Sequence, residues 1–314
     1  STLCPYTPVS RSFSSWAKFH DGFLLWPTNH RPPQPNWFSP RNILAELAHA
    51  VRQRGLRFGL YYSGALDWAF GTPPIRDLVD LLTSGPGHRT YGRYVDAHYR
   101  ELIHSLRPDI LWNDIGYPPQ GNRDAILAEY YNLQPEGCIN DRWLQYGPWM
   151  QVTRLPLLRA LVNQAGRRAM QAGQTGAPLP IHADFLTPEF TTFANTQSKK
   201  FEVVMSFGCS VGYNAQENEN DLLSVQDMIH RFCDILSKNG NLLLVVAPQA
   251  DGSISEPIQR RLLALGNWVR QHTPAIFAAR PWKQSQSTTD EGIPIRFTAT
   301  QDALYLFLLG HPTQ

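Results

Sequence analysis

Apolar residues follow two alternating spacings between residues 40 and 275. Apolar side chains three and four positions apart predict amphipathic helices over residues 42–54, 94–106, 123–133 and 223–238. Short, nearly continuous apolar runs between these helices predict buried strands over residues 56–63, 109–114, 137–142 and 241–247. Such runs are typical of parallel strands that are covered on both faces. The alternation therefore predicts an α/β fold built from repeated strand–helix units.

Polar and aromatic residues collect where the predicted strands end. Carboxylate, amide, guanidinium and aromatic groups occur together at residues 19–23, 61–63, 112–114, 140–142 and 212–214. Active sites of (β/α)8 barrels are built at the carboxyl ends of the strands. We therefore predict a (β/α)8-like TIM barrel. A doubly wound sheet is the alternative, but no G-x-G-x-x-G sequence opens a helix.

Two regions interrupt the strand–helix regularity. Residues 144–182 combine a helical stretch with a Gly/Ala/Pro-rich exit and predict an insertion in the barrel. Near the end of the chain, residues 295–300 and 304–308 show alternating or continuous β patterns separated by turn residues. We therefore expect a catalytic barrel over residues 1–275 and the start of a C-terminal β domain over residues 276–314.

Composition excludes several classes of function. The 314 residues carry a net charge of +2, charged residues make up 17% of them, and the basic ones are scattered, so nucleic acid is not an expected partner. No apolar run approaches the length of a membrane span, so we expect a soluble protein of the cytoplasm, the periplasm or the outside of the cell. The four cysteines are far apart and form no Cys-x-x-Cys pair, which predicts free thiols.

Asp114 is the first candidate for chemistry. It ends the predicted strand 109–114, and no Lys or Arg follows it directly. Glycoside hydrolysis with retention needs two carboxyl groups roughly 5 Å apart, one acting as nucleophile and one as acid/base. A strand-end aspartate suits the nucleophile. The alternative is that Asp114 caps the next helix, but residues 115–119 read as a loop.

Six segments resemble one family in order and spacing. Residues 111–118, Leu-Trp-Asn-Asp-Ile-Gly-Tyr-Pro, closely resemble the nucleophile segment of the α-L-fucosidases of glycoside hydrolase family 29. The other five segments are residues 17–23, 57–68, 140–143, 212–214 and 241–252. The resemblance covers roughly residues 17–310 and implies a TIM-barrel enzyme that acts on α-L-fucosyl units.

The resemblance also implies roles for individual residues. It makes Asp114 the nucleophile, and it places six residues around the sugar: His20, Tyr61, Trp68, Trp112, Arg142 and Val211. A cation at Arg142 would keep Asp114 ionised and ready to attack. A surface salt bridge is the alternative role for Arg142.

The acid/base is less tightly specified. Residues 184–190 resemble the stretch that supplies it in close relatives, and this points to Glu189. Neighbouring phenylalanines would help to keep such a carboxyl protonated near neutral pH. The alternatives are Glu202, Glu217 and Glu219.

The expected mechanism is double displacement through a fucosyl–enzyme ester, with Asp114 as nucleophile and Glu189 as acid/base. No cofactor is expected, and because the histidines show no His-x-x-x-His pattern, no metal is expected either. The expected partner is an α-L-fucosylated saccharide.

Three departures from the family leave other functions open. The family begins with a further strand and helix that residues 1–15 do not resemble, so we expect a barrel without its first βα unit, with an open edge that favours a homo-oligomer. Phe19 stands where many relatives have a second histidine, and Val211 where an aromatic is usual. The alternatives are a catalytically weakened fucose-binding protein and a hydrolase for another deoxy or galacto-configured sugar.

Overall fold

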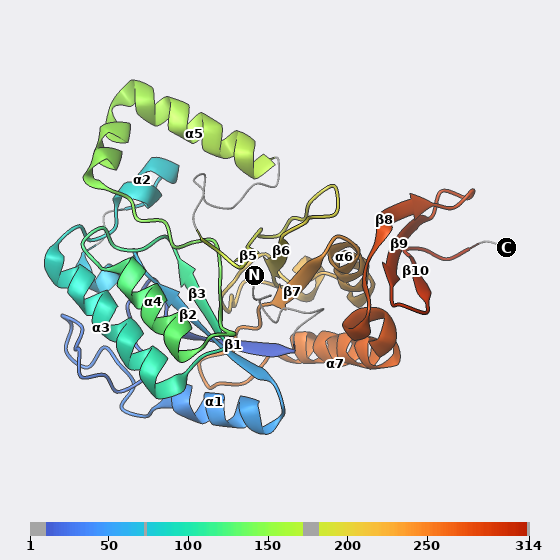
Figure 1. Ribbon diagram of the computed structural model, residues 1–314, viewed down its shortest axis with the longest axis horizontal. Helices are drawn as coiled ribbons and strands as arrows, with labels where there is room; N and C mark the ends of the chain where they lie inside the picture. Colours follow the sequence, from blue (N-terminus) through green and yellow to red (C-terminus); the bar gives the residue numbers. More distant parts are fainter. Residues whose placement is uncertain (1–10, 72–73, 172–181, 313–314) are drawn as a thin grey trace. The chain divides into compact units, whose positions relative to one another are not determined.

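The computed structural model describes residues 11–71, 74–171 and 182–312, which divide into two units at residues 185 and 186 (Figure 1). The architecture is α/β, as the periodicity predicts. In the part that is described, the parallel strands form a four-stranded and a three-stranded sheet, fewer than the eight strands of a complete barrel. No helix within these ranges is both long and apolar enough to cross a membrane.

The first unit is built on a parallel sheet in the order β1-β2-β3-β4. Its strands are β1 (Ser12–Lys18), β2 (Arg57–Ser63), β3 (Ile110–Asp114) and β4 (Cys138–Ile139). The register pairs Tyr61 with Trp112 and Ser63 with Asp114. Because parallel strands end at the same edge, this register brings the last residues of β2 and β3 together.

Three helices of the first unit were predicted from the periodicity. They are α1 (Ile43–Gln53), α3 (Arg89–Leu106) and α4 (Arg123–Leu133). Asparagine caps explain two of their starts, because the side chains of Asn42 and Asn122 accept backbone N–H groups of the first turns. Helix α1 contacts β1 and β2, and α3 packs against α1 and α4 (Figure 1).

A second group of elements follows the strand ends of the first unit. The 3-10 helix η1 (Trp68–Phe70) and the short α2 (Leu78–Thr83) come after β2, whereas η2 (Pro148–Arg154) and α5 (Pro156–Gln171) come after β4. Arg159 of α5 pairs with Asp77 and Asp80 at the start of α2, at 2.8 Å each. The predicted insertion at 144–182 thus contains helical structure, and its residues 172–181 lie outside the described ranges.

The second unit carries the remaining elements. Its parallel strands β6 (Lys200–Met205) and β7 (Gly240–Leu244) pair in register, and β5 (Phe185–Leu186) spans the boundary between the units. Its helical elements are η3 (Glu219–Asp221), α6 (Val225–Ser237), α7 (Glu256–Gln271) and η4 (Pro274–Ala278). Strands β8 (Arg280–Thr288), β9 (Pro294–Ala299) and β10 (Leu304–Leu308) form an antiparallel sheet.

Several details differ from the sequence-based expectations. Strand β1 pairs with β2 from Ser12, with a register shift between Trp16 and Lys18, although the residues before Ala17 resemble no family segment. Helix α7 was not predicted, and Leu265 packs its face into the core of the second unit. Free thiols were expected, and Cys209 and Cys233 are free, but Cys138 is disulfide-bonded, so that expectation is wrong for it. The domain boundary at residue 275 stays a prediction.

Candidate active site

The carboxylate of Asp114 accepts three hydrogen bonds at the end of β3. Its Oδ2 accepts from the Tyr61 hydroxyl at 2.6 Å, and its Oδ1 accepts from the Arg142 guanidinium at 3.0 Å. The backbone N–H of Ile115 donates to Oδ1 at 2.9 Å. Asp114 is only 7% exposed. A carboxylate bound to one cation and two further donors is fixed in position, and its negative charge is stabilised.

The chain turns sharply directly after Asp114. Ile115 has a φ of 59° and Gly116 a φ of 84°. A β-branched residue rarely adopts this left-handed conformation, which costs about 1–3 kcal/mol and is characteristic of functional sites. A side chain at Gly116 would come within 2.6 Å of the Leu144 carbonyl. The turn directs the Ile115 N–H back to the carboxylate. The capping alternative for Asp114 is wrong, because Asn122 caps the next helix.

Asn113 anchors the backbone around the nucleophile candidate. Its backbone exchanges hydrogen bonds with the side chain of Asn140, at 3.0 and 2.8 Å. Its own amide donates to the Arg142 carbonyl at 2.7 Å, and its Oδ1 accepts from the hydroxyl of Tyr99 at 2.6 Å. Both asparagines are fully buried. Side-chain amides therefore continue the link between β3 and the segment after β4, and they hold Arg142 beside Asp114.

Aromatic rings line the same edge of the sheet. The rings of Tyr61 and Trp112 stack with centroids 5.4 Å apart, and Phe19 stacks on Tyr61 at 5.8 Å and on His20 at 4.2 Å. The Arg142 guanidinium lies 4.8 Å from the centre of the Trp112 ring, a cation–π distance. The Nε2 atom of His20 lies 4.0 Å from Asp114 Oδ2. Four predicted substrate-binding residues thus surround the predicted nucleophile.

Three further predicted site residues have surroundings of their own. Trp68 is 56% exposed, and its backbone N–H donates to the His20 carbonyl at 2.8 Å. Val211 and Glu189 belong to the second unit, where both are half-buried. Glu189 forms an isolated parallel bridge with Val204 of β6, followed by a left-handed Phe190 with a φ of 53°.

Two alternatives to Glu189 have structural contacts of their own. Glu217 accepts the backbone N–H groups of Cys209 and Ser210, at 2.7 and 3.3 Å, and so closes a loop. Glu219 pairs with Arg260 and Arg261 of α7. The third alternative, Glu202, is buried within β6. Glu217 and Glu219 therefore hold segments of the second unit together.

Two further residues of the site were missed. Ser63 bonds to His20, with its Oγ 2.8 Å from Nδ1, and its position as the last residue of β2 was the available signal. Burial raises the pKa of Tyr146 to about 12, the Arg142 cation lowers it, and the Asp114 charge raises it. Tyr146 also lines a cavity of about 230 Å³ together with Ile115. No sequence pattern marked Tyr146. Within the described ranges, no three His, Cys, Asp or Glu side chains gather closely enough to hold a metal ion.

Solved structures similar to this chain include several fucosidases. An α-fucosidase from Thermotoga maritima in complex with a mechanism-based inhibitor is 35% identical with a TM-score of 0.80, and the match covers 96% of this chain and 62% of that one. The same enzyme in complex with fucose is 36% identical with a TM-score of 0.78. This similarity confirms the predicted barrel-like fold class.

Curated sequences give the same result. Tissue α-L-fucosidase from Mus musculus is 29% identical over 311 residues, which cover 94% of this chain and 59% of that protein. The Homo sapiens enzyme is 28% identical over 312 residues and is covered to 57%. The chain thus spans a little under 60% of these relatives. The family model described as Alpha-L-fucosidase matches residues 11–273. Because that match takes in most of the sequence, the chain belongs to the α-L-fucosidase family.

Proposed function

We propose that this protein is a retaining α-L-fucosidase that hydrolyses terminal α-L-fucosyl residues of oligosaccharides or glycoconjugates. The observation that carries the proposal is the carboxylate of Asp114, held by Tyr61 and Arg142 in the segment that resembles the family's nucleophile. The Thermotoga maritima structures with fucose and with a mechanism-based inhibitor support the choice of sugar. The substrate is an α-L-fucosylated saccharide.

In the first step Asp114 attacks the anomeric carbon, and the bond from that carbon to the leaving oxygen breaks. Glu189 gives its proton to the leaving oxygen, and a fucosyl ester forms on Asp114. The carboxylate loses its charge in this ester. The hydrogen bonds from Tyr61 and Arg142 therefore weaken in the intermediate and strengthen again when the ester is cleaved.

In the second step a water molecule attacks the same carbon. Glu189 takes one proton from the water, the ester bond breaks, and fucose leaves with the stereochemistry that it had in the substrate. Asp114 is again a carboxylate, and Glu189 is again protonated. Every proton that leaves one group in this cycle is received by another, so no further reactant is needed.

The surroundings of Asp114 suit a 6-deoxy sugar. The rings of Phe19, Tyr61 and Trp112 form a continuous apolar surface on which C–H groups and the methyl group of fucose can pack. His20 and Arg142 offer polar atoms for hydroxyl groups on the same edge. We assign Trp68 and Val211 to the sugar site from the family resemblance.

The test is hydrolysis of an aryl α-L-fucoside by the wild type and by Asp114→Gly. We expect the rate to fall by at least about 10³-fold, because the nucleophile is lost. Added azide should restore turnover of the Asp114→Gly variant and give the β-fucosyl azide, since the small anion attacks from the vacated side. The matched control is Asp109→Asn, at the other end of β3, where the carboxylate accepts the Phe58 N–H at 2.9 Å.

Three outcomes would contradict the proposal in different ways. Full activity of Asp114→Gly would remove Asp114 from the chemistry. Fucose binding without turnover in well-folded wild type would indicate a fucose-binding protein. Turnover of other aryl 6-deoxy or galacto-configured glycosides, with none of the fucoside, would indicate a related hydrolase of different specificity.

A further inference from the structure

Two successive contacts hold the His20 ring at its Nδ1 atom. Its Nδ1 lies 2.8 Å from the Oγ of Ser63, and this Oγ lies 2.9 Å from the carbonyl oxygen of Leu66. Ser63 is fully buried at the end of β2, in register with Asp114. The other ring nitrogen of His20, Nε2, is the one that lies 4.0 Å from Asp114.

The chemistry of these atoms decides where the protons lie. A carbonyl oxygen can only accept, so the hydroxyl of Ser63 must donate its single proton to Leu66. The Ser63 oxygen can then only accept from His20, which places a hydrogen on Nδ1. The opposite arrangement, with Ser63 donating to His20, would leave two oxygens 2.9 Å apart with no proton between them.

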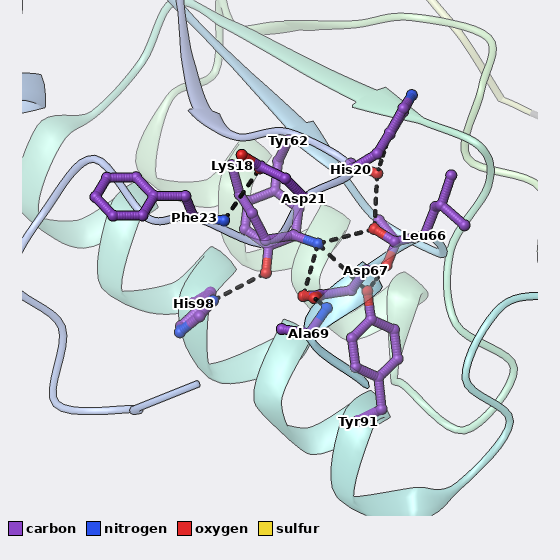
Figure 2. Close-up of polar contacts among 12 residues, drawn as sticks. Lys18, His20, Asp21, Phe23, Tyr62, Leu66, Asp67, Ala69, Tyr91 and His98 are labelled. Carbon is purple, nitrogen blue, oxygen red and sulfur yellow. Dashed lines mark hydrogen bonds and ion pairs between the residues drawn. The ribbon is translucent and has the colours of Figure 1, made fainter. Parts of the chain in front are cut away.

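The loop that carries the Leu66 carbonyl is itself fixed (Figure 2). Lys18 donates to the Leu66 carbonyl and to Asp67 Oδ2, at 3.0 Å each, and its Nζ lies 3.4 Å from the Tyr91 hydroxyl. Lys18 and Asp67 are fully buried. The backbone N–H of Trp68, in the same loop, donates to the His20 carbonyl at 2.8 Å. The loop therefore holds both the backbone and the ring of His20.

We propose that Ser63 is a positioning residue that keeps the proton of His20 on Nδ1, so that the neutral ring turns the lone pair of Nε2 toward Asp114. An Nε2 without hydrogen accepts a hydrogen bond, and it selects a ligand group that can donate one. If the protein is the fucosidase proposed above, this group is a sugar hydroxyl beside the nucleophile. An ether oxygen at that place would face two acceptors, His20 Nε2 and the Asp114 carboxylate, and could donate to neither. A ligand with an ether oxygen there should therefore not bind.

The proton position can be measured directly, whether or not the chain turns over a fucoside. Long-range proton–nitrogen NMR spectra of the ¹⁵N-labelled protein distinguish a ring nitrogen that carries hydrogen from one that does not. The sequence has ten histidines, and the signal lost in His20→Gln identifies the ring of interest. At a pH at which this ring is neutral, we expect hydrogen on Nδ1 and none on Nε2.

Variants of Ser63 test the cause. Ser63→Ala should shift the His20 signals toward a mixture of the two tautomers, and Ser63→Thr, which keeps a hydroxyl, should restore them. The matched control is Ser39→Ala. Ser39 is also buried, donates to the Arg41 carbonyl at 2.7 Å and accepts the Arg41 N–H, but does not contact His20. Hydrogen on Nε2 in the wild type, or an unchanged His20 signal in folded Ser63→Ala, would overturn the proposal.

Kinetics give a second measurement if the wild type is active. Losing the oriented acceptor should raise KM for the aryl fucoside about 10-fold in Ser63→Ala and change kcat much less. Ser63→Thr should recover most of the difference. A fall in kcat alone, with the tautomer and KM unchanged, would contradict a positioning role. If the wild type lacks activity, the proposed function fails while the NMR result still decides the role of Ser63.

Discussion

The two candidate catalytic carboxyl groups lie in regions of different character. Asp114 ends a buried strand, and two of its three donors, Tyr61 and Arg142, are held in turn by the Trp112 ring and, for Arg142, by the buried Asn113. Glu189 belongs to the second unit and lies outside its regular strands, in an isolated bridge with Val204 of β6. The difference teaches that a nucleophile benefits from a carboxylate that is ionised and fixed in position, and a strand end provides such a position. An acid/base must exchange a proton twice in each cycle, and a loop can supply it from several positions.

The same contrast holds for the surrounding side chains. In the first unit, the ion pair of Lys18 with Asp67 and the hydrogen bond between Tyr62 and His98 are fully buried. In residues 209–221, the carboxylate of Glu217 binds backbone N–H groups, and that of Glu219 binds the exposed Arg260 and the more buried Arg261. We therefore expect the effects of substitutions near Asp114 to be non-additive. The effects of substitutions in residues 209–221 should be additive.

The largest effect that would test this comparison is expected for Glu189→Ala. Loss of a general acid and base should lower kcat about 10²–10⁴-fold for a fucoside with a poor leaving group, and much less for a dinitrophenyl fucoside. The measurement is the dependence of kcat on the pKa of the leaving group. Glu217→Gln and Glu219→Gln are the controls, and the same leaving-group dependence in either of them would move the role away from Glu189.

Breaking the buried ion pair of Lys18 with Asp67 should strongly lower the stability of the first unit. Lys18→Met leaves the Asp67 carboxylate buried without its cation, and we expect the first unit to lose about 3–5 kcal/mol of unfolding free energy. Urea titration followed by tryptophan fluorescence would measure this loss. In the exposed pair of Arg41 with Glu46, the substitution Arg41→Met should change stability by less than about 1 kcal/mol. Equal losses in the two variants would contradict the contrast between buried and exposed pairs.

The first unit should also lose stability in acid through His98. Burial of the fully enclosed ring lowers the pKa of His98 to about 3, although the hydrogen bond to the His30 carbonyl raises it. Nε2 lies 2.8 Å from that carbonyl oxygen, and Nδ1 lies 2.8 Å from the Tyr62 hydroxyl. The unfolded chain binds a proton at its ordinary pKa of about 6.5, whereas the folded ring does not. Unfolding free energy should therefore fall by up to about 1.4 kcal/mol per pH unit between about pH 6.5 and 3.

This pH dependence has a direct control. His98→Gln should flatten the slope of unfolding free energy against pH in that window, since the amide does not titrate there. His49→Gln, at an exposed position of α1, should leave the slope unchanged. An unchanged slope in folded His98→Gln would show that other groups cause the acid sensitivity.

The smallest effect is expected for Tyr61→Phe. The variant keeps the ring stacked on Trp112 but removes the hydroxyl that donates to Asp114 at 2.6 Å. Without this donor the carboxylate is less well positioned for attack on the anomeric carbon, so kcat/KM should fall about 10-fold. Steady-state kinetics would measure the change. A larger loss of activity in Tyr61→Phe than in Glu189→Ala would contradict the expected order of the two effects.

The sequence alone determined the local elements and the nucleophile region. Helices α1, α4 and α6 follow from apolar spacing and polar caps, because both signals lie within a few residues of each other. The segment 109–114 was readable as a buried strand for the same reason. Since parallel strands place their carboxyl ends at one edge, Asp114, Tyr61, Trp112 and Arg142 could be assigned to one cluster before any contact was known.

Tertiary structure decided what depends on residues distant in the chain. Ser63 is an ordinary strand serine in the sequence, and its role arises only because Leu66 and His20 approach it from two sides. Burial and the nearby charge of Asp114 raise the pKa of Tyr146, and Cys138 forms a disulfide bond. Strand β1 begins at Ser12 because β2 offers a partner in register. Pairing, burial and proton positions are properties of contacts, and the local pattern of residues does not contain them.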